Sequence, residues 1–153
     1  MLKHHYGHMA RVLHWCTEQA MTNALAQMEL TSAQGHIMGY LAHRAEPPCP
    51  KDIEEAFRLS HPTVCGLLQR LEAKGFIESR PDPRDRRCKR IYILEKGHQC
   101  HALMHQTILS TEERVVTGFT PEEKAQFSDL LERAIINMGG GPCQRIHKED
   151  SND

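Results

Sequence analysis

The sequence predicts a mainly α-helical fold with one small β-hairpin. Apolar residues recur at helical spacing over most of the chain, and two short β-branched segments flank a charged turn. Proline or glycine stands at most of the expected boundaries. The expected order is four helices, the hairpin and two more helices. Short helices around a turn followed by a hairpin form a winged helix-turn-helix domain, here flanked by N- and C-terminal helices.

The composition limits the class of protein. The chain has 153 residues, enough for one structural unit with a core of its own. No apolar run approaches the ~20 residues of a membrane helix, and histidines interrupt the N-terminus where an export signal needs an apolar core. Six cysteines without a C-x-x-C pair indicate reduced thiols. We therefore expect a cytoplasmic protein that does not bind membranes.

Local signals place the first three helices. Apolar residues recur every three or four positions over residues 4–27, which predicts a first helix longer than a small core needs. Thr31 is expected to cap the second helix, with Gln34 as its reciprocal partner. The proline-rich segment 46–50 then ends that helix, and a third begins near Lys51.

The fourth helix and the hairpin follow. Ser60 before the helix and Pro62 in its first turn are both favoured at a helix start, and Gly75 is a suitable end. Residues 76–80 and 90–94 are the expected strands, because both are rich in strand formers and a turn-rich segment separates them.

The remaining chain predicts two helices and a tail. A long helix starts near Glu95, and Thr120-Pro121-Glu122-Glu123 is a strong start for the last one. The tail is glycine-rich, then polar, and is expected to be disordered. The chain thus divides into an N-terminal dimerisation helix (1–30), a winged helix-turn-helix module (31–97), C-terminal dimerisation helices (98–138) and a disordered tail (139–153).

The fourth helix has the pattern of a helix that reads DNA. Such a helix carries small or polar side chains that reach bases and phosphates, and an apolar stripe that holds it on the domain. The expected stripe is Val64, Leu67, Leu68 and Leu71. The expected DNA contacts from this helix are Ser60, His61, Thr63, Gln69 and Arg70.

The hairpin turn concentrates positive charge in a chain whose net charge is only -1. Six basic and two acidic residues fall between positions 80 and 90, a local charge of +4. Arginines on a thin hairpin can enter a narrow minor groove while their neighbours contact phosphates. Asp85 is expected to hold the Arg87 guanidinium through a charge-assisted fork. The expected contacts are Arg84, Asp85, Arg86, Arg87, Lys89 and Arg90. A solvated charged loop is the simpler alternative.

These segments resemble the MarR family of transcription regulators. Residues 60–97 (SHPTVCGLLQRLEAKGFIESRPDPRDRRCKRIYILEKG) are similar to its recognition helix, its wing and the start of the next helix. The family's D-x-R wing motif falls on Asp85 and Arg87, whereas Glu95 replaces the usual threonine after the last wing strand. Residues 30–42 (LTSAQGHIMGYLA) resemble the family's second helix.

The resemblance covers roughly residues 10–138 and implies a function. It implies a DNA-binding regulator, expected to be a ligand-responsive repressor, whose homodimer places two winged modules on a pseudo-palindromic operator. The residues agree on the dimer, because the terminal helices are longer than the core of one subunit can cover. A ligand that prefers another spacing of the two wings would then release the DNA.

Three hypotheses remain open for what the protein senses and which residues sense it. A small anionic or aromatic ligand could lie in a crevice lined by His14, Trp15, His36, Met38 and Tyr40. Ordinary packing explains each of these residues singly. A metal could bind histidines four apart on a helix face, either His4 with His8 or His101 with His105, beside His98 and Cys100. Redox sensing could use Cys16 or Cys65. No cofactor or effector is identified.

Two other classes of protein are alternatives to a DNA-binding regulator. An enzyme is not expected, because the sequence has no glycine-rich phosphate loop and no nucleophile elbow. A winged helix that docks onto proteins without binding DNA is the serious alternative. The arginine-rich turn favours DNA, because a docking module has no need to concentrate cations there.

Overall fold

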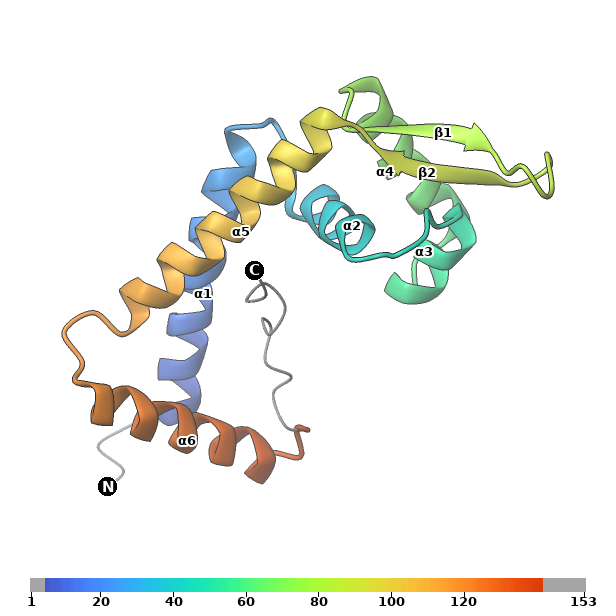
Figure 1. Ribbon diagram of the computed structural model, residues 1–153. Coiled ribbons are helices and arrows are strands. Elements are labelled where there is room, and N and C mark those ends of the chain that lie inside the picture. Colours follow the sequence, from blue (N-terminus) through green and yellow to red (C-terminus); the bar gives the residue numbers. More distant parts are fainter. Residues whose placement is uncertain (1–4, 142–153) are drawn as a thin grey trace. The chain divides into compact units, whose positions relative to one another are not determined.

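The computed structural model describes residues 5–141, which form two compact units divided between Thr111 and Glu112. Within these residues the fold is mainly α-helical with one antiparallel hairpin, as predicted (Figure 1). The elements are α1 (Tyr6–Ala26), α2 (Ser32–Ala42), α3 (Pro50–Phe57), α4 (His61–Ala73), β1 (Ile77–Pro81), β2 (Lys89–Ile93), α5 (Glu95–Val115) and α6 (Pro121–Asn137). The predicted tail lies outside the described residues from position 142 onward.

Helix boundaries follow the local capping signals. The Thr31 hydroxyl accepts a hydrogen bond from the Gln34 N–H at 3.3 Å, and the Gln34 side chain accepts one from the Thr31 N–H at 3.0 Å. Thr120 and Glu123 make the same reciprocal pair at the start of α6. Gly75 takes a φ of 79° just after α4, a left-handed conformation that glycine adopts without steric cost. Both capping boxes and this helix end are therefore confirmed.

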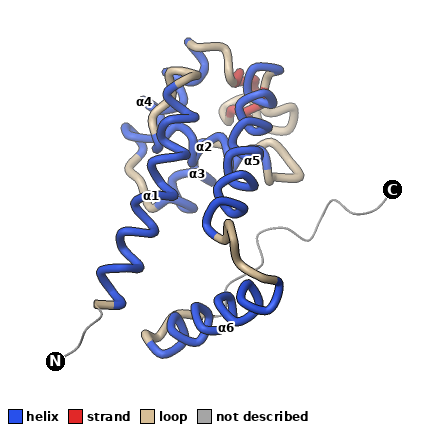
Figure 2. Tube along the Cα trace, turned by 90° about the vertical axis from the view of Figure 1, so that its left-hand side faces the viewer, coloured by secondary structure: helices blue, strands red, loops and turns tan. Residues whose placement is uncertain are grey.

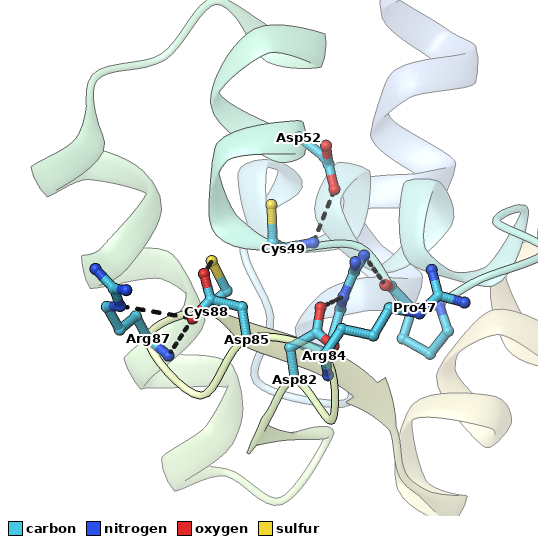
Figure 3. A network of polar contacts seen from close by, with 9 residues as sticks. Pro47, Cys49, Asp52, Asp82, Arg84, Asp85, Arg87 and Cys88 are labelled. Carbon is cyan, nitrogen blue, oxygen red and sulfur yellow. Dashed lines mark hydrogen bonds and ion pairs between the residues drawn. The ribbon is translucent and has the colours of Figure 1, made fainter.

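The proline-rich segment after α2 also begins α3 and bonds to β2. Pro50 is the first residue of α3, as a proline in a first turn should be. The carbonyl of Pro48 accepts a hydrogen bond from the Ile91 N–H at 2.9 Å, so this segment runs beside β2. The Cys49 N–H donates to Asp52 at 2.8 Å and caps α3 (Figure 3). This hydrogen bond also lowers the pKa of the Asp52 carboxyl.

The hairpin is displaced by one residue from the prediction on each strand. Its register pairs Ile77 with Ile93 and Pro81 with Lys89. Phe76, expected to open the first strand, instead donates its N–H to the Leu71 carbonyl at 3.0 Å and completes the end of α4. Its ring is fully buried, so it anchors the hairpin to the core from just outside the sheet.

The core lies between α2, α3, α4 and the hairpin. Its largest fully buried side chains include Phe76, Ile37, Ile53 and Ile77. Figure 1 shows these helices gathered beside the two strands, and Figure 2 shows the same part of the chain from the side, with the strands drawn in red. The predicted apolar stripe of α4 is buried at all four positions, Val64, Leu67, Leu68 and Leu71. Burial of this stripe turns the opposite face of α4 toward solvent.

The outer helices leave much of their apolar surface exposed. Among its described residues, α1 buries only Ala24 and Leu25, and α6 buries none. Large exposed side chains on α1 are Tyr6, Met9, Val12 and Trp15, and on α6 they are Leu130, Leu131, Ile135 and Ile136. None of the described helices has the length and hydropathy needed to cross a bilayer.

Two helical glycines provide a matched test of this packing. A methyl group on Gly97 would collide with the Phe76 carbonyl and lie 2.5 Å from the Ile93 side chain, whereas one on Gly66 would meet nothing within 4 Å. We expect Gly97→Ala to lower the free energy of unfolding by roughly 1 to 3 kcal/mol. Gly66→Ala should raise it by roughly 0.5 to 1 kcal/mol. Urea unfolding followed by circular dichroism, at one protein concentration, measures both. A Gly97→Ala protein as stable as the wild type would contradict this packing.

Candidate nucleic-acid interface

The solvent face of α4 carries the polar side chains that the sequence indicated. All five predicted positions are exposed, namely Ser60, His61, Thr63, Gln69 and Arg70. The Ser60 hydroxyl makes no cap to the helix backbone and lies 2.8 Å from the Thr63 hydroxyl instead. Both hydroxyls keep further hydrogen-bonding capacity, so this end of α4 can still bond a base edge or a phosphate.

His61 connects α4 to α3, a contact that the sequence did not reveal. Its Nδ1 lies 2.5 Å from Glu54 Oε1, and its Nε2 lies 3.3 Å from the Sγ of Cys65 one turn along α4. The His61 side chain is 69% exposed, against 22% for Glu54. The i,i+4 spacing of His61 and Cys65 was the available signal, but Glu54 is seven positions away on another helix.

The wing turn presents four exposed cations, Arg84, Arg86, Arg87 and Lys89. The predicted ion pair between Asp85 and Arg87 forms, but the fork does not. Arg87 Nε lies 3.8 Å from Asp85 Oδ1, while the same oxygen accepts the Arg87 backbone N–H at 3.0 Å (Figure 3). Asp85 therefore shapes the backbone of the turn, and the Arg87 side chain stays 95% exposed. A side chain in this state can reach a groove.

Arg90 differs from the other predicted DNA contacts. Its Nε donates to Asp82 Oδ2 at 2.7 Å, and a terminal nitrogen donates to the Pro47 carbonyl at 3.1 Å. Asp82 is buried, and its second oxygen accepts the Arg84 N–H at 2.8 Å. The hydrogen bond from Arg84 and then that from Arg90 lower the pKa of Asp82, and Asp82 raises the pKa of Arg90. Arg90 is thus committed to the base of the wing.

Only part of the predicted ligand crevice comes together. An open hollow of about 550 Å³ is lined by Gly35, His36, Gly39, Tyr40, His43, Arg44, Phe57 and Met104. His36 and Tyr40 were predicted. Met38 is 0% exposed in the core, and the predicted residues of α1, His14 and Trp15, do not line this hollow. Phe57 and Met104 come from α3 and α5, and no local pattern could have joined them to α2.

The geometry of the described residues gives the metal hypothesis little support. Among residues 5–141, no three His, Cys, Asp or Glu side chains are grouped so as to hold a metal, and His4 lies outside this range. The His101 ring packs edge-on against His43, with centroids 5.3 Å apart. Burial, followed by the charge of His43, lowers the pKa of His101. Cys16 is exposed, and burial raises the pKa of Cys100.

Comparison with known proteins gives the family. The model of the MarR family matches residues 28–87. The HTH-type transcriptional regulator YybA of Bacillus subtilis is 30% identical over 101 residues, which cover 65% of this chain and 67% of YybA. The chain belongs to the MarR family. It is therefore a winged helix-turn-helix, DNA-binding transcription regulator, and its relatives are regulators rather than enzymes.

Other members of the family are similar over most of their length. PecS of Dickeya dadantii, a transcriptional regulator, is 25% identical over 78% of this chain and 75% of its own. MepR is a transcription regulator of a Staphylococcus aureus multidrug efflux pump, and its crystal structure is similar to this chain. The match covers 88% of this chain and 99% of MepR. Its TM-score is 0.80 at 27% identity. MepR has also been solved bound to DNA (TM-score 0.77) and to ethidium bromide (TM-score 0.69).

The Asp82 carboxylate predicts a pH dependence for the stability of this MarR-family chain. Because the pKa of Asp82 is lowered on folding, its contribution is complete above its ordinary value of 3.8 and is lost as the pH falls through the folded value. Asp82→Asn should therefore be less stable than the wild type at pH 6, with a difference that shrinks below pH 4. Urea midpoints from pH 3 to pH 7 measure this.

Asp129 provides the control for that experiment. It also pairs with an arginine, Arg133, at 3.7 Å, but both side chains are 68% exposed. Exposed pairs contribute little to stability, so Asp129→Asn should follow the wild-type curve. A constant difference between Asp82→Asn and the wild type over this pH range would show that Asp82 stabilises the wing without its charge.

Proposed function

We propose that this protein is a ligand-responsive repressor that binds a pseudo-palindromic operator as a homodimer in the cytoplasm. The observation that carries the proposal is the pairing of two exposed surfaces in one small module. These are the polar face of α4 and the four cations of the wing turn. The solved complex of MepR with DNA supports this use of the fold.

The two surfaces have different tasks in this proposal. Side chains of α4 read base edges in the major groove, with Thr63, Gln69 and Arg70 as candidates beside Ser60 and His61. The wing cations contact phosphates or the minor groove, where the negative potential is strongest. Arg90 contributes indirectly, because it holds the wing through Asp82. The docking-module alternative leaves the four exposed cations of the turn without a role.

In the proposed dimer, a second copy of the chain covers the exposed apolar side chains of α1 and α6. Residues 1–30 and 98–138 are the proposed dimerisation segments, and α1 and α6 each leave four or more large apolar side chains exposed. Surfaces of this kind are rarely left open in a soluble monomer. We expect light scattering at micromolar concentration to give twice the chain mass of 17.5 kDa. A mass of one chain would contradict the dimer.

The effector proposed for this regulator is a small aromatic molecule bound in the hollow of α2, α3 and α5. The hollow offers the rings of Tyr40 and Phe57, which contact each other edge-on at 5.5 Å. The Arg44 guanidinium lies 5.4 Å from the centre of the Tyr40 ring and could pair with a carboxylate. MepR bound to ethidium supports an aromatic ligand. Benzoate is an aromatic anion and ethidium is an aromatic cation. Measuring the release of bound DNA by each compound therefore tests which charge the ligand carries.

The exposed Arg87 side chain of the wing turn predicts how its removal affects DNA binding. Arg87→Ala removes an exposed guanidinium without disturbing the Asp85–Arg87 backbone hydrogen bond. We expect it to weaken operator binding by roughly 1 to 3 kcal/mol, about 5- to 150-fold in Kd. Fluorescence anisotropy with DNA from upstream of the protein's own gene measures this, with unrelated DNA as competitor and the salt concentration varied.

Arg133→Ala is the matched control, because it removes the same charge from α6, outside the winged module. Its Kd and salt dependence should equal those of the wild type. If Arg87→Ala binds the operator as tightly as Arg133→Ala does, Arg87 has no part in recognition. If the wild-type protein shows no salt-dependent preference for any DNA in a genome-wide selection, the protein-docking alternative is correct.

A further inference from the structure

Two lysine side chains join the C-terminal end of the DNA-reading helix to the long helices α1 and α5. Lys74, the residue after α4, donates its ammonium group to the carbonyl of Glu29 at the end of α1, 45 positions away. Lys96, in the first turn of α5, donates its ammonium group to the carbonyl of Lys74 at 2.9 Å. A single residue at the end of α4 is thus bonded to both long helices.

The end of α1 has an unusual residue at its left-handed position. The Leu30 N–H donates to the Leu25 carbonyl at 3.0 Å, and the Glu29 N–H donates to the Ala26 carbonyl at 3.0 Å, which is the Schellman pattern. Glu29 takes a φ of 58°, where glycine is the usual residue because a side chain is sterically unfavourable there. The Lys74 ammonium binds the carbonyl of this residue, at the helix end where the dipole favours a cation.

This turn, residues 27–31, connects α1 to the winged module. Among the described residues of α1 only Ala24 and Leu25 are buried, and both lie in its last turn. Leu25 packs so closely on α2 that a methyl group on Gly35 would lie 2.5 Å from its side chain. The direction of α1 relative to the module is therefore set at its last turn, where the Lys74 hydrogen bond is made.

The backbone of Lys74 is fixed on both sides. Its N–H donates to the Arg70 carbonyl at 3.1 Å, and its carbonyl accepts the Lys96 ammonium. That ammonium also lies 4.5 Å from the centre of the Phe76 ring, which is fully buried, and a cation at this distance is attracted to the ring face. Lys74 itself is half-buried. The position of its ammonium group therefore follows the position of α4.

A small turn of the module at this end of α4 has a large effect where the helix meets DNA. Because α4 has 13 residues, its first turn lies about 20 Å from Lys74. A rotation of about 10° about Lys74 moves that first turn by about 3.5 Å, close to the rise of one base pair. In the proposed dimer, which is joined partly through residues 1–30, the same rotation changes the distance between the two DNA-reading helices.

We propose that Lys74 is a positioning residue for DNA binding, and that its bond to Glu29 sets the half-site spacing that the dimer accepts. With this bond the winged module keeps one orientation relative to α1, so one spacing fits both modules of the dimer. Without it the module turns at residues 27–31, and DNA binding has to restore the lost order at a cost in affinity. The affinity for a single half-site is unchanged, because one module then binds alone. This inference rests on the proposed function.

The first experiment tests the hydrogen bond in the intact protein without DNA. Exchange of the Glu29 and Leu30 amide hydrogens, followed by NMR, reports opening of the last turn of α1. We expect Lys74→Met to exchange both amides at least about fivefold faster than the wild type, and Lys74→Arg, which keeps a cationic donor, to stay within about twofold. Lys124→Met, on the exposed surface of α6, is the matched control. Wild-type exchange rates in Lys74→Met would overturn the proposal.

The second experiment varies the spacing between two copies of the half-site selected by the wild-type protein. Fluorescence anisotropy gives Kd for duplexes with one or two base pairs inserted or removed between the copies. We expect one base pair to weaken wild-type binding at least about tenfold. Lys74→Met should bind the best duplex at least about tenfold more weakly and vary less than about threefold over the series. Lys74→Arg and Lys124→Met should follow the wild type.

A duplex with one half-site scrambled separates positioning from direct contact. Wild type and Lys74→Met should bind it equally, which also shows that the variant is folded. Equal weakening on one and on two half-sites would make Lys74 a direct DNA contact and overturn the positioning role. If Lys74→Met distinguishes the spacings as sharply as the wild type, the role of Lys74 is wrong and the proposed function stands. A wild-type protein indifferent to spacing would contradict the proposed dimer on a pseudo-palindromic operator, and the role of Lys74 with it.

Discussion

The ion pair between Arg90 and Asp82 is the constraint on which the DNA-binding surface depends. A hairpin with two five-residue strands is marginally stable by itself in water. Here Ile77 and Ile91 are buried in the core, and the Arg90 guanidinium bonds both the buried Asp82 and the carbonyl of Pro47. One side chain thus joins the two strands of the wing to the segment between α2 and α3. The direction in which the wing tip projects follows from this junction.

The same charge chemistry has different results at the base and at the tip of the wing. At the base, Asp82 is buried and its hydrogen bonds to Arg84 and Arg90 are short, so the charges hold structure. At the tip, Asp85 bonds the backbone of the turn and leaves the arginine side chains extended into water. Exposed cations of this kind lose little when they move from water to phosphate, because both surroundings solvate charge. A buried cation could not make that exchange.

Local signals in the sequence were enough to predict the order and the boundaries of the helices. Capping boxes at Thr31 and Thr120, the glycine after α4 and the prolines before α3 each act within four residues, so the helix boundaries could be predicted. The one-residue displacement of the hairpin arose at Phe76, whose backbone serves the helix end. The site was less accessible to prediction, because the partners of Arg90 and His61 lie 43 and 7 positions away. The sequence predicted the exposed cations of the wing turn, but it did not predict the contacts of Arg90 and His61.

The position of α5 explains how the hollow and the wing can affect each other. This helix begins at Glu95 directly after β2, and Gly97 and Cys100 are buried near its start. Gly97 lies so close to Phe76 and Ile93 that the first turn of α5 cannot shift without moving the hairpin. Met104, two turns further on, lines the hollow together with α2 and α3. A ligand that displaced Met104 would therefore act on a helix whose other end is fixed against the wing, and the tight contact at Gly97 would carry the displacement to the DNA-reading surface.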